Sequence, residues 1–214
     1  MIPTLSLYED TFSDGVEVRL NGTTARMLFV VHGTIAVDGA TRGDGETWHG
    51  IGDAAGVSAG ATGATVWRWD FSSAQPALPL AGDGVQSRLK LSAPLETLPT
   101  GPLLLRGDSV AFPPGGCAFR HVHEGPGIRC LIEGGIRIDT HGRSTAYGPG
   151  GAWFESGPEP VFAQAAAERA SRFIRVMILP AKLVGKSSIR YVDPADNDKP
   201  RSQSYKIFVD APLP

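Results

Sequence analysis

Short apolar or alternating segments, separated by turn residues, run along most of this chain. Met27 to Val31, Thr65 to Phe71 and Arg172 to Leu179 have the length and residue types of strands, and glycine or proline lies between such segments. The only candidates for helix are Ala163 to Ala170 and Pro180 to Gly185. The pattern therefore predicts an all-β protein with many short strands and tight turns.

The order of these segments repeats. A strand-like run that reaches a glycine, a second run that ends in Asp and a Gly-x-x-Trp motif follow one another twice. The residues concerned are Gly33, Asp38 and Trp48 in the first half and Gly134, Asp139 and Trp153 in the second. We predict two similar β-domains, residues 1–75 and 101–180, joined by a proline-rich linker over 76–100. We expect the extension over 181–214, with two strand-like runs, to pack on the other barrel or on a second subunit.

Charge and composition exclude several classes of function. Twenty basic residues stand against 22 acidic ones, and no dense Lys/Arg run occurs, so no nucleic-acid partner is expected. No apolar segment is long enough to span a bilayer, and Met1 to Thr4 lacks the features of a signal peptide. We therefore expect a cytoplasmic protein without a membrane partner. Cys117 and Cys130 are expected to be reduced and packed, a thiol role for Cys117 being the less favoured alternative.

The tripeptide His121-Val122-His123 is the strongest candidate for chemistry. It ends a strand-like run that begins at Phe119 and lies between a Pro-Pro-Gly-Gly turn and a Gly-Pro-Gly turn. Side chains two residues apart on a strand point to the same face, so both imidazoles project together. Two convergent nitrogen donors suit a divalent metal ion. The alternative is a polar pair that is hydrogen-bonded inside a barrel.

These motifs resemble those of the cupin superfamily, specifically a bicupin. The resemblance implies two tandem jelly-roll β-barrels. His121 and His123 match the His-x-His pair of the first cupin motif, and Gly134 matches the glycine at the following turn. Gly127 stands where the glutamate of that motif belongs. The first half has no His-x-His, so the resemblance implies a structural barrel there.

The second cupin motif is matched in its first part only. The segment 150–158 resembles its glycine-initiated strand and turn, but Glu159-Pro160-Val161 stands where the last metal-binding histidine should follow. Because Glu155 lies on the strand that should line the same cavity, it is the best candidate for a third ligand. Together with His121 and His123 it would form a two-histidine, one-carboxylate set for Fe, Ni, Mn or Zn. The alternative is a surface or hydrogen-bonding glutamate.

Two further residues are candidates for substrate binding. Strand alternation from Gly127 places Arg129 on the inward face. A guanidinium inside an apolar barrel needs an anionic partner, which is either Glu155 or a substrate carboxylate. Trp153 is expected to fill the barrel core and is also a candidate wall for a ligand cavity.

Two functions remain open on this basis. The first is a metal-dependent enzyme, of dioxygenase, isomerase or lyase type, that acts on a small organic acid or aromatic compound. The second is a non-catalytic cupin that binds or senses a small molecule. If the histidine pair is instead purely structural, the protein works through its surface. A homodimer is expected, since such barrels often join by adding strands across an interface.

Overall fold

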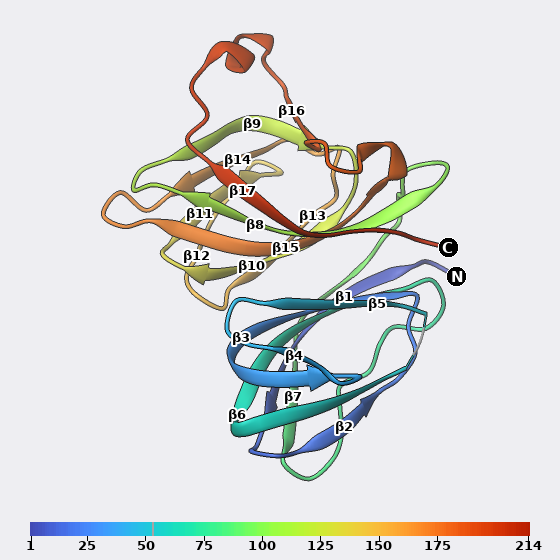
Figure 1. The fold of residues 1–214 in the computed structure, drawn as a ribbon. Coiled ribbons are helices and arrows are strands. Elements are labelled where there is room, and N and C mark those ends of the chain that lie inside the picture. Colours follow the sequence, from blue (N-terminus) through green and yellow to red (C-terminus); the bar gives the residue numbers. More distant parts are fainter. Residues whose placement is uncertain (53) are drawn as a thin grey trace. The chain divides into compact units, whose positions relative to one another are not determined.

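The computed structural model describes residues 1–52 and 54–214 and divides the chain into two compact units. The first comprises Met1–Glu96 with Leu213, and the second comprises Thr97–Pro212 with Pro214. In the described part of the chain, regular structure is strand apart from two short 3-10 helices, η1 (Ala181–Leu183) and η2 (Pro194–Asp198) (Figure 1). The all-β prediction is confirmed. No helix within the described residues is long and apolar enough to cross a membrane.

The first unit is built on one antiparallel sheet of seven strands. Its strands are β1 (Thr4–Phe12), β2 (Glu17–Leu20), β3 (Ala25–Val37), β4 (Ala40–Arg42), β5 (Thr47–Ile51), β6 (Ala55–Ser72) and β7 (Val85–Pro94). The order is β4-β3-β6-β1-β7, with β2 paired to β6 and β5 paired to β3. Strands β3 and β6 are long and change partners along their length, which allows the sheet to close around an apolar core that includes Leu28, Val30 and Val66.

The expected linker over 76–100 is wrong in its second half. Residues 85–94 form β7, which pairs antiparallel with β1 from Thr4↔Pro94 to Phe12↔Val85. Most side chains of β7 are exposed or half-buried, because it is an edge strand that contacts the sheet on one side only. Such a strand has little apolar periodicity from which it can be predicted.

The second unit consists of two five-stranded antiparallel sheets. Its strands are β8 (Leu103–Phe112), β9 (Cys117–His123), β10 (Gly127–Glu133), β11 (Ile136–Thr140), β12 (Arg143–Tyr147), β13 (Ala152–Glu155), β14 (Val161–Ala165), β15 (Ser171–Pro180), β16 (Ile189–Tyr191) and β17 (Ser204–Pro212). One sheet has the order β13-β10-β15-β8-β17 and the other has the order β12-β11-β14-β9-β16. The core includes Leu131, Trp153 and Phe173.

The segment after residue 180 is part of this second unit. Strand β17 pairs with β8 and β16 pairs with β9, so the segment adds the last strand to each sheet. The segment is therefore not a separate extension, as the sequence suggested. Without β16 and β17, strands β9 and β8 would be sheet edges with unpaired backbone N–H and C=O groups. In Figure 1 this segment, coloured orange to red, crosses the side of the unit that carries β9 and β8.

The two helix candidates have different outcomes. Pro180 to Gly185 contains η1, a single 3-10 turn. Ala163 to Ala170 is not helical: its first residues belong to β14, in which Val161, Ala163 and Ala165 are buried and alternate with half-buried neighbours. Burial of every second side chain requires the period of a strand, and this tertiary requirement outweighs the helix propensity of alanine.

The internal repeat extends to the pairing of strands. In each unit, one row of directly paired residues crosses four strands. The row is Trp48, Leu28, Arg68 and Tyr8 in the first unit and Trp153, Arg129, Arg175 and Asp108 in the second. The tryptophan and one arginine are common to both rows. The second unit has a cationic Arg129 at the position where the first unit has the apolar Leu28.

Candidate metal centre

A small cavity lies inside the second unit. Its volume is about 60 Å³, which is room for a few water molecules or a ligand of a few heavy atoms. The wall combines polar side chains with apolar ones, among them Ala118, Ile138 and Phe173. His121, His123, Arg129, Trp153 and Glu155 all line it.

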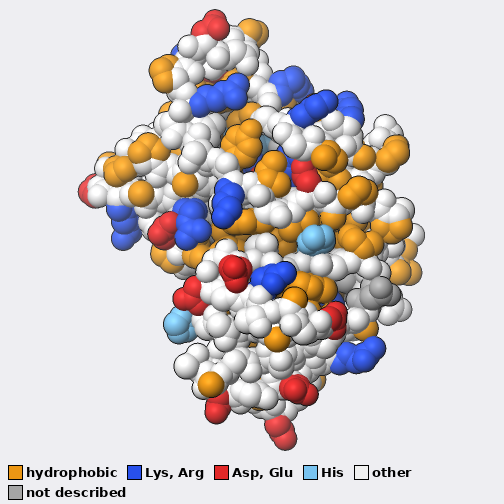
Figure 2. Space-filling model, viewed as in Figure 1, with side chains coloured by type: hydrophobic (Ala, Val, Ile, Leu, Met, Phe, Trp, Pro, Cys, Tyr) orange, Lys and Arg blue, Asp and Glu red, His pale blue; other side chains and the backbone are white. Residues whose placement is uncertain are grey.

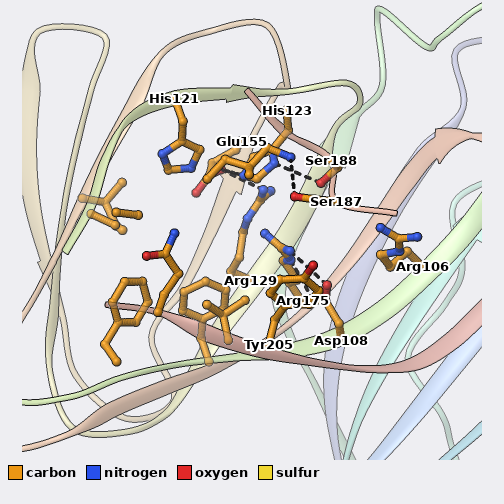
Figure 3. Close-up of a pocket in the computed structure, with 18 of the residues that line it drawn as sticks. Arg106, Asp108, His121, His123, Arg129, Glu155, Arg175, Ser187, Ser188 and Tyr205 are labelled. Atoms are coloured by element: carbon orange, nitrogen blue, oxygen red, sulfur yellow. Dashed lines mark hydrogen bonds and ion pairs between the residues drawn. The ribbon is translucent and has the colours of Figure 1, made fainter. Parts of the chain in front are cut away.

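The two histidines project into this cavity from β9. Their rings lie with centroids 4.9 Å apart, and the residues are 5% and 6% exposed (Figure 3). The intervening Val122 is also buried, because β9 is covered on both faces. Strand alternation therefore brings the two imidazoles together, as their spacing predicts.

Hydrogen bonds fix the tautomer of both rings. His121 Nδ1 lies 2.7 Å from the carbonyl oxygen of Phe119, which can only accept, so Nδ1 carries the proton. His123 Nδ1 lies 3.2 Å from Ser188 Oγ, whose own hydroxyl is directed at the sulfur of Met177. Nδ1 of His123 is therefore the donor in that bond too. Each ring is left with an unprotonated Nε2, which is the arrangement found in metal-ligating histidines.

Burial keeps both imidazoles uncharged. Loss of solvation lowers the pKa of His121, and the same effect lowers the pKa of His123 well below its usual value. Both rings are thus neutral at pH 7. A metal-binding histidine must be in this form.

Glu155 supplies a buried carboxylate next to the histidines. Its Oε1 accepts a hydrogen bond of 2.8 Å from Trp153 Nε1, which fixes the orientation of the carboxylate. Its Oε2 lies 3.5 Å from His123 Nε2 and 2.7 Å from Arg129 Nη2. His121, His123 and Glu155 each have a ligand atom at the site, and these three atoms lie within 4.8 Å of one another.

The strand register explains how Glu155 reaches this place. Gly127, at the position of the cupin glutamate, pairs directly with Glu155 across β10 and β13. A Cβ at Gly127 would lie 2.4 Å from the carbonyl oxygen of Val176, so the backbone leaves no room for a side chain there. The carboxylate therefore comes from the adjacent strand. Val161, one of the residues in place of the missing histidine, pairs with His121 and is buried.

Arg129 is fully buried beside Glu155. Its Nη1 donates to the carbonyl oxygen of Gly127 at 2.7 Å, and its Nε is buried without a hydrogen-bond partner among the described residues. Glu155 Oε2 also has no hydrogen-bond partner of good geometry among the described residues. Its 2.7 Å contact with Arg129 Nη2 is therefore an ion pair without an aligned hydrogen bond. Burial lowers the pKa of Arg129 to about 10, although Glu155 opposes the shift, and the guanidinium stays charged at pH 7. The sequence indicated either Glu155 or a substrate carboxylate as the anionic partner of Arg129, and in the structure Glu155 lies next to it.

A second ion pair, between the buried Asp108 and the half-buried Arg175, was not foreseen from the sequence. Asp108 accepts two hydrogen bonds from Arg175, of 2.6 and 2.9 Å, at the lower side of the site in Figure 3. Burial alone would lower the pKa of Arg175, but Asp108 raises it above its usual value. Arg175 is therefore already neutralised. Alternation along β15 indicates its inward direction, whereas no local pattern predicts its pairing with Asp108.

Other candidates lie outside the cavity. His141 is exposed in its turn, with Nδ1 3.6 Å from Glu159. Cys117 is half-buried and Cys130 is buried. Ser188, by contrast, lines the cavity and orients His123, but it comes from the segment after residue 180 and was not predicted. In the face drawn in Figure 2, Lys and Arg side chains (blue) gather over the part of the second unit that carries this segment.

The donor set fits a divalent metal ion. Two neutral imidazoles and one carboxylate suit first-row ions and leave coordination positions for water or a ligand. Glu155 accepts a hydrogen bond from Trp153, and the two histidines donate to Ser188 and to the Phe119 carbonyl, so all three metal-binding side chains are held in place before any ion binds.

Comparison with known proteins supports this fold. No protein-family model matches the sequence, and no curated protein matches it either. Solved structures do match. A deletion mutant of Bacillus subtilis oxalate decarboxylase has a TM-score of 0.63 and 13% identity, over 91% of this chain and 73% of that one. A putative glyoxylate-induced protein from Pseudomonas aeruginosa has a TM-score of 0.59 and 15% identity, over 82% and 74%.

A third neighbour carries the name of the superfamily. The cupin 2 conserved barrel domain protein from Leptotrichia buccalis has a TM-score of 0.51 and 11% identity, over 83% of this chain and 84% of that one. These neighbours are cupin-barrel proteins, so the resemblance drawn from the two motifs is confirmed at the level of the fold. The chain has the cupin fold.

Proposed function

We propose that the second unit is a metal-dependent enzyme acting on a small carboxylic acid. The observation that carries this proposal is the convergence of His121, His123 and Glu155, whose donor atoms lie within 4.8 Å of one another in a buried cavity. Buried histidines and carboxylates clustered in a cavity are typical of functional sites.

His121, His123 and Glu155 would hold the ion. A divalent Fe, Ni, Mn or Zn ion would supply Lewis-acid chemistry, or oxygen activation if it is iron. The chain supplies the rest: Trp153 and Ser188 orient the ligands, and the apolar wall excludes bulk water. Exclusion of water strengthens each electrostatic contact made with the substrate.

The cavity favours a small acid over an aromatic compound. About 60 Å³ is far below the 300–1,000 Å³ that is typical of pockets for drug-sized ligands. Arg129 offers a guanidinium suited to a carboxylate. The names of two structural neighbours, oxalate decarboxylase and glyoxylate-induced protein, refer to acids of this size.

A non-catalytic binding protein is the second candidate function. The contact between Arg129 and Glu155 favours it, because this pair neutralises itself without an ion. A metal-free protein that binds a small carboxylate would match this function.

Elemental analysis of protein purified without added metal tests the proposal. We expect close to one equivalent of a first-row metal in the wild type and a loss of it in the H121A/H123A double variant. His141→Ala is the matched control, because His141 is exposed in a turn, and it should retain the metal. Unchanged metal content in the double variant would refute the site.

Assays of metal-loaded protein then separate the two functions. Turnover of small carboxylic acids that depends on His121 and His123 supports the enzyme. Binding of such an acid by protein that takes up no metal supports the second candidate.

A further inference from the structure

One carboxylate oxygen at the site contacts both a guanidinium and a neutral imidazole. Glu155 Oε2 lies 2.7 Å from Arg129 Nη2 and 3.5 Å from the unprotonated His123 Nε2. The other oxygen, Oε1, is occupied by the hydrogen bond from Trp153. The oxygen that neutralises Arg129 is therefore the one that faces the histidines.

The charge at the site balances only while no ion is present. Arg129 is completely buried and Glu155 is 7% exposed, so solvent screens neither charge well. The neighbouring Arg175 and Asp108 neutralise each other through two hydrogen bonds, and Asp108 is not free to serve Arg129. A divalent cation held by Glu155 would leave the site with a net positive charge and Arg129 without its counterion.

We propose that metal binding converts Arg129 into the receptor for the carboxylate group of the ligand, so that the metal and a small monocarboxylate bind cooperatively. This inference rests on the proposed function. In the metal-free protein Glu155 satisfies Arg129 and competes with any external carboxylate. Once the charge of Glu155 is directed to the ion, an external carboxylate restores the balance.

The surroundings of Arg129 define the class of ligand. The guanidinium has a buried Nε without a hydrogen-bond partner among the described residues, so it retains donor capacity. Apolar side chains, among them Val110, Ile138 and Phe173, form much of the remaining wall. A carboxylate with a short apolar tail matches these features, whereas a second carboxylate on the ligand would meet an apolar surface.

The coupling can be measured without an assay of activity. Zn²⁺ affinity of the metal-stripped protein is determined by calorimetry in chloride and again in saturating acetate. We expect acetate to tighten Zn²⁺ binding about tenfold, and by linkage Zn²⁺ must tighten acetate binding by the same factor. Cobalt(II) gives a second readout, because its visible absorption changes when acetate binds close to the ion.

Two arginine variants make the test specific. The first variant is Arg129→Leu. Leucine is chosen because the first unit has a leucine, Leu28, at the equivalent position of its row of paired residues. This variant should bind Zn²⁺ but lose the effect of acetate. Arg172→Leu is the matched control: Arg172 pairs with Glu133 at the surface, and this variant should keep the full effect. Chelation of Zn²⁺ by free acetate is the same in all three proteins and is subtracted.

The outcomes distinguish the two proposals. If the wild type takes up no Zn²⁺ while its fold is intact, the proposed function fails. If Zn²⁺ binds through His121 and His123 but acetate leaves its affinity unchanged or weakens it, only the cooperative role of Arg129 is overturned. If Arg129→Leu keeps the wild-type response to acetate, the carboxylate binds elsewhere and the inference is likewise overturned.

Discussion

The ion pair between Arg129 and Glu155 leads to a prediction about stability in the absence of metal. At 2.7 Å, two unit charges attract by about 6 kcal/mol if the effective dielectric constant is about 20. Glu155→Gln keeps the shape of the side chain and an acceptor for Trp153, but leaves the buried Arg129 unpaired. We expect the second unit to lose about 3–5 kcal/mol of unfolding free energy.

A double-mutant cycle isolates the pair. Arg129→Leu alone leaves the carboxylate of Glu155 buried without its cation, and it should also destabilise the second unit. The double variant removes both charges, and we expect it to cost at least about 2 kcal/mol less than the sum of the single variants. Glu159→Gln, at a partly exposed position, is the control and should change stability by less than about 0.5 kcal/mol.

The cysteines provide an assay that reports the second unit by itself. The chain has two cysteines, Cys117 and Cys130, and both lie in this unit. Cys130 is fully buried next to Arg129 on β10, so its rate of reaction with a thiol reagent in increasing urea measures opening of that unit. Additive effects of the two single variants, or a Glu155→Gln variant as stable as the wild type, would refute the role given to the ion pair.

Three further predictions concern the construction of the site. Ser188→Ala removes the acceptor that fixes the His123 tautomer, so metal affinity should fall about 10–100-fold in calorimetry, and an unchanged affinity would contradict this role. Gly127→Ala forces a methyl group to within 2.4 Å of the Val176 carbonyl oxygen and should cost about 1–3 kcal/mol in the urea assay, whereas a neutral effect would show that β10 can shift. Ile138→Ala enlarges the cavity and should lower the free energy of unfolding by about 2–5 kcal/mol. Acids with longer apolar tails should then gain affinity relative to acetate, and an unaltered preference would mean that the ligand does not contact Ile138.

The sequence predicts those parts of the site that depend on one strand. His121 and His123 converge because β9 is a strand, and the flanking turns mark its ends. The inward direction of Arg129 follows from alternation along β10, counted from Gly127, the position that the resemblance assigns to the cupin glutamate. The proximity of Glu155 needed one more piece of information, the resemblance to the second cupin motif, which places its strand beside the same cavity.

Contacts between distant segments could not be predicted in this way. Ser188 lies 65 residues from His123 and Asp108 lies 67 residues from Arg175. Nothing in the local pattern of Lys186 to Tyr191 distinguishes a strand of the second barrel from a free tail. Strand β7 forms because it pairs with β1, and its own sequence has little apolar periodicity. Residues 76–100 were therefore predicted to be a linker.

The pairing of β17 with β8 has a practical consequence for work with this protein. Ser188, Gln203 and Tyr205, all from the last part of the chain, help to form the wall of the cavity. During translation, therefore, the cavity cannot close until the ribosome has released these residues. Truncated variants that end after β15 would retain both histidines yet lack a finished pocket.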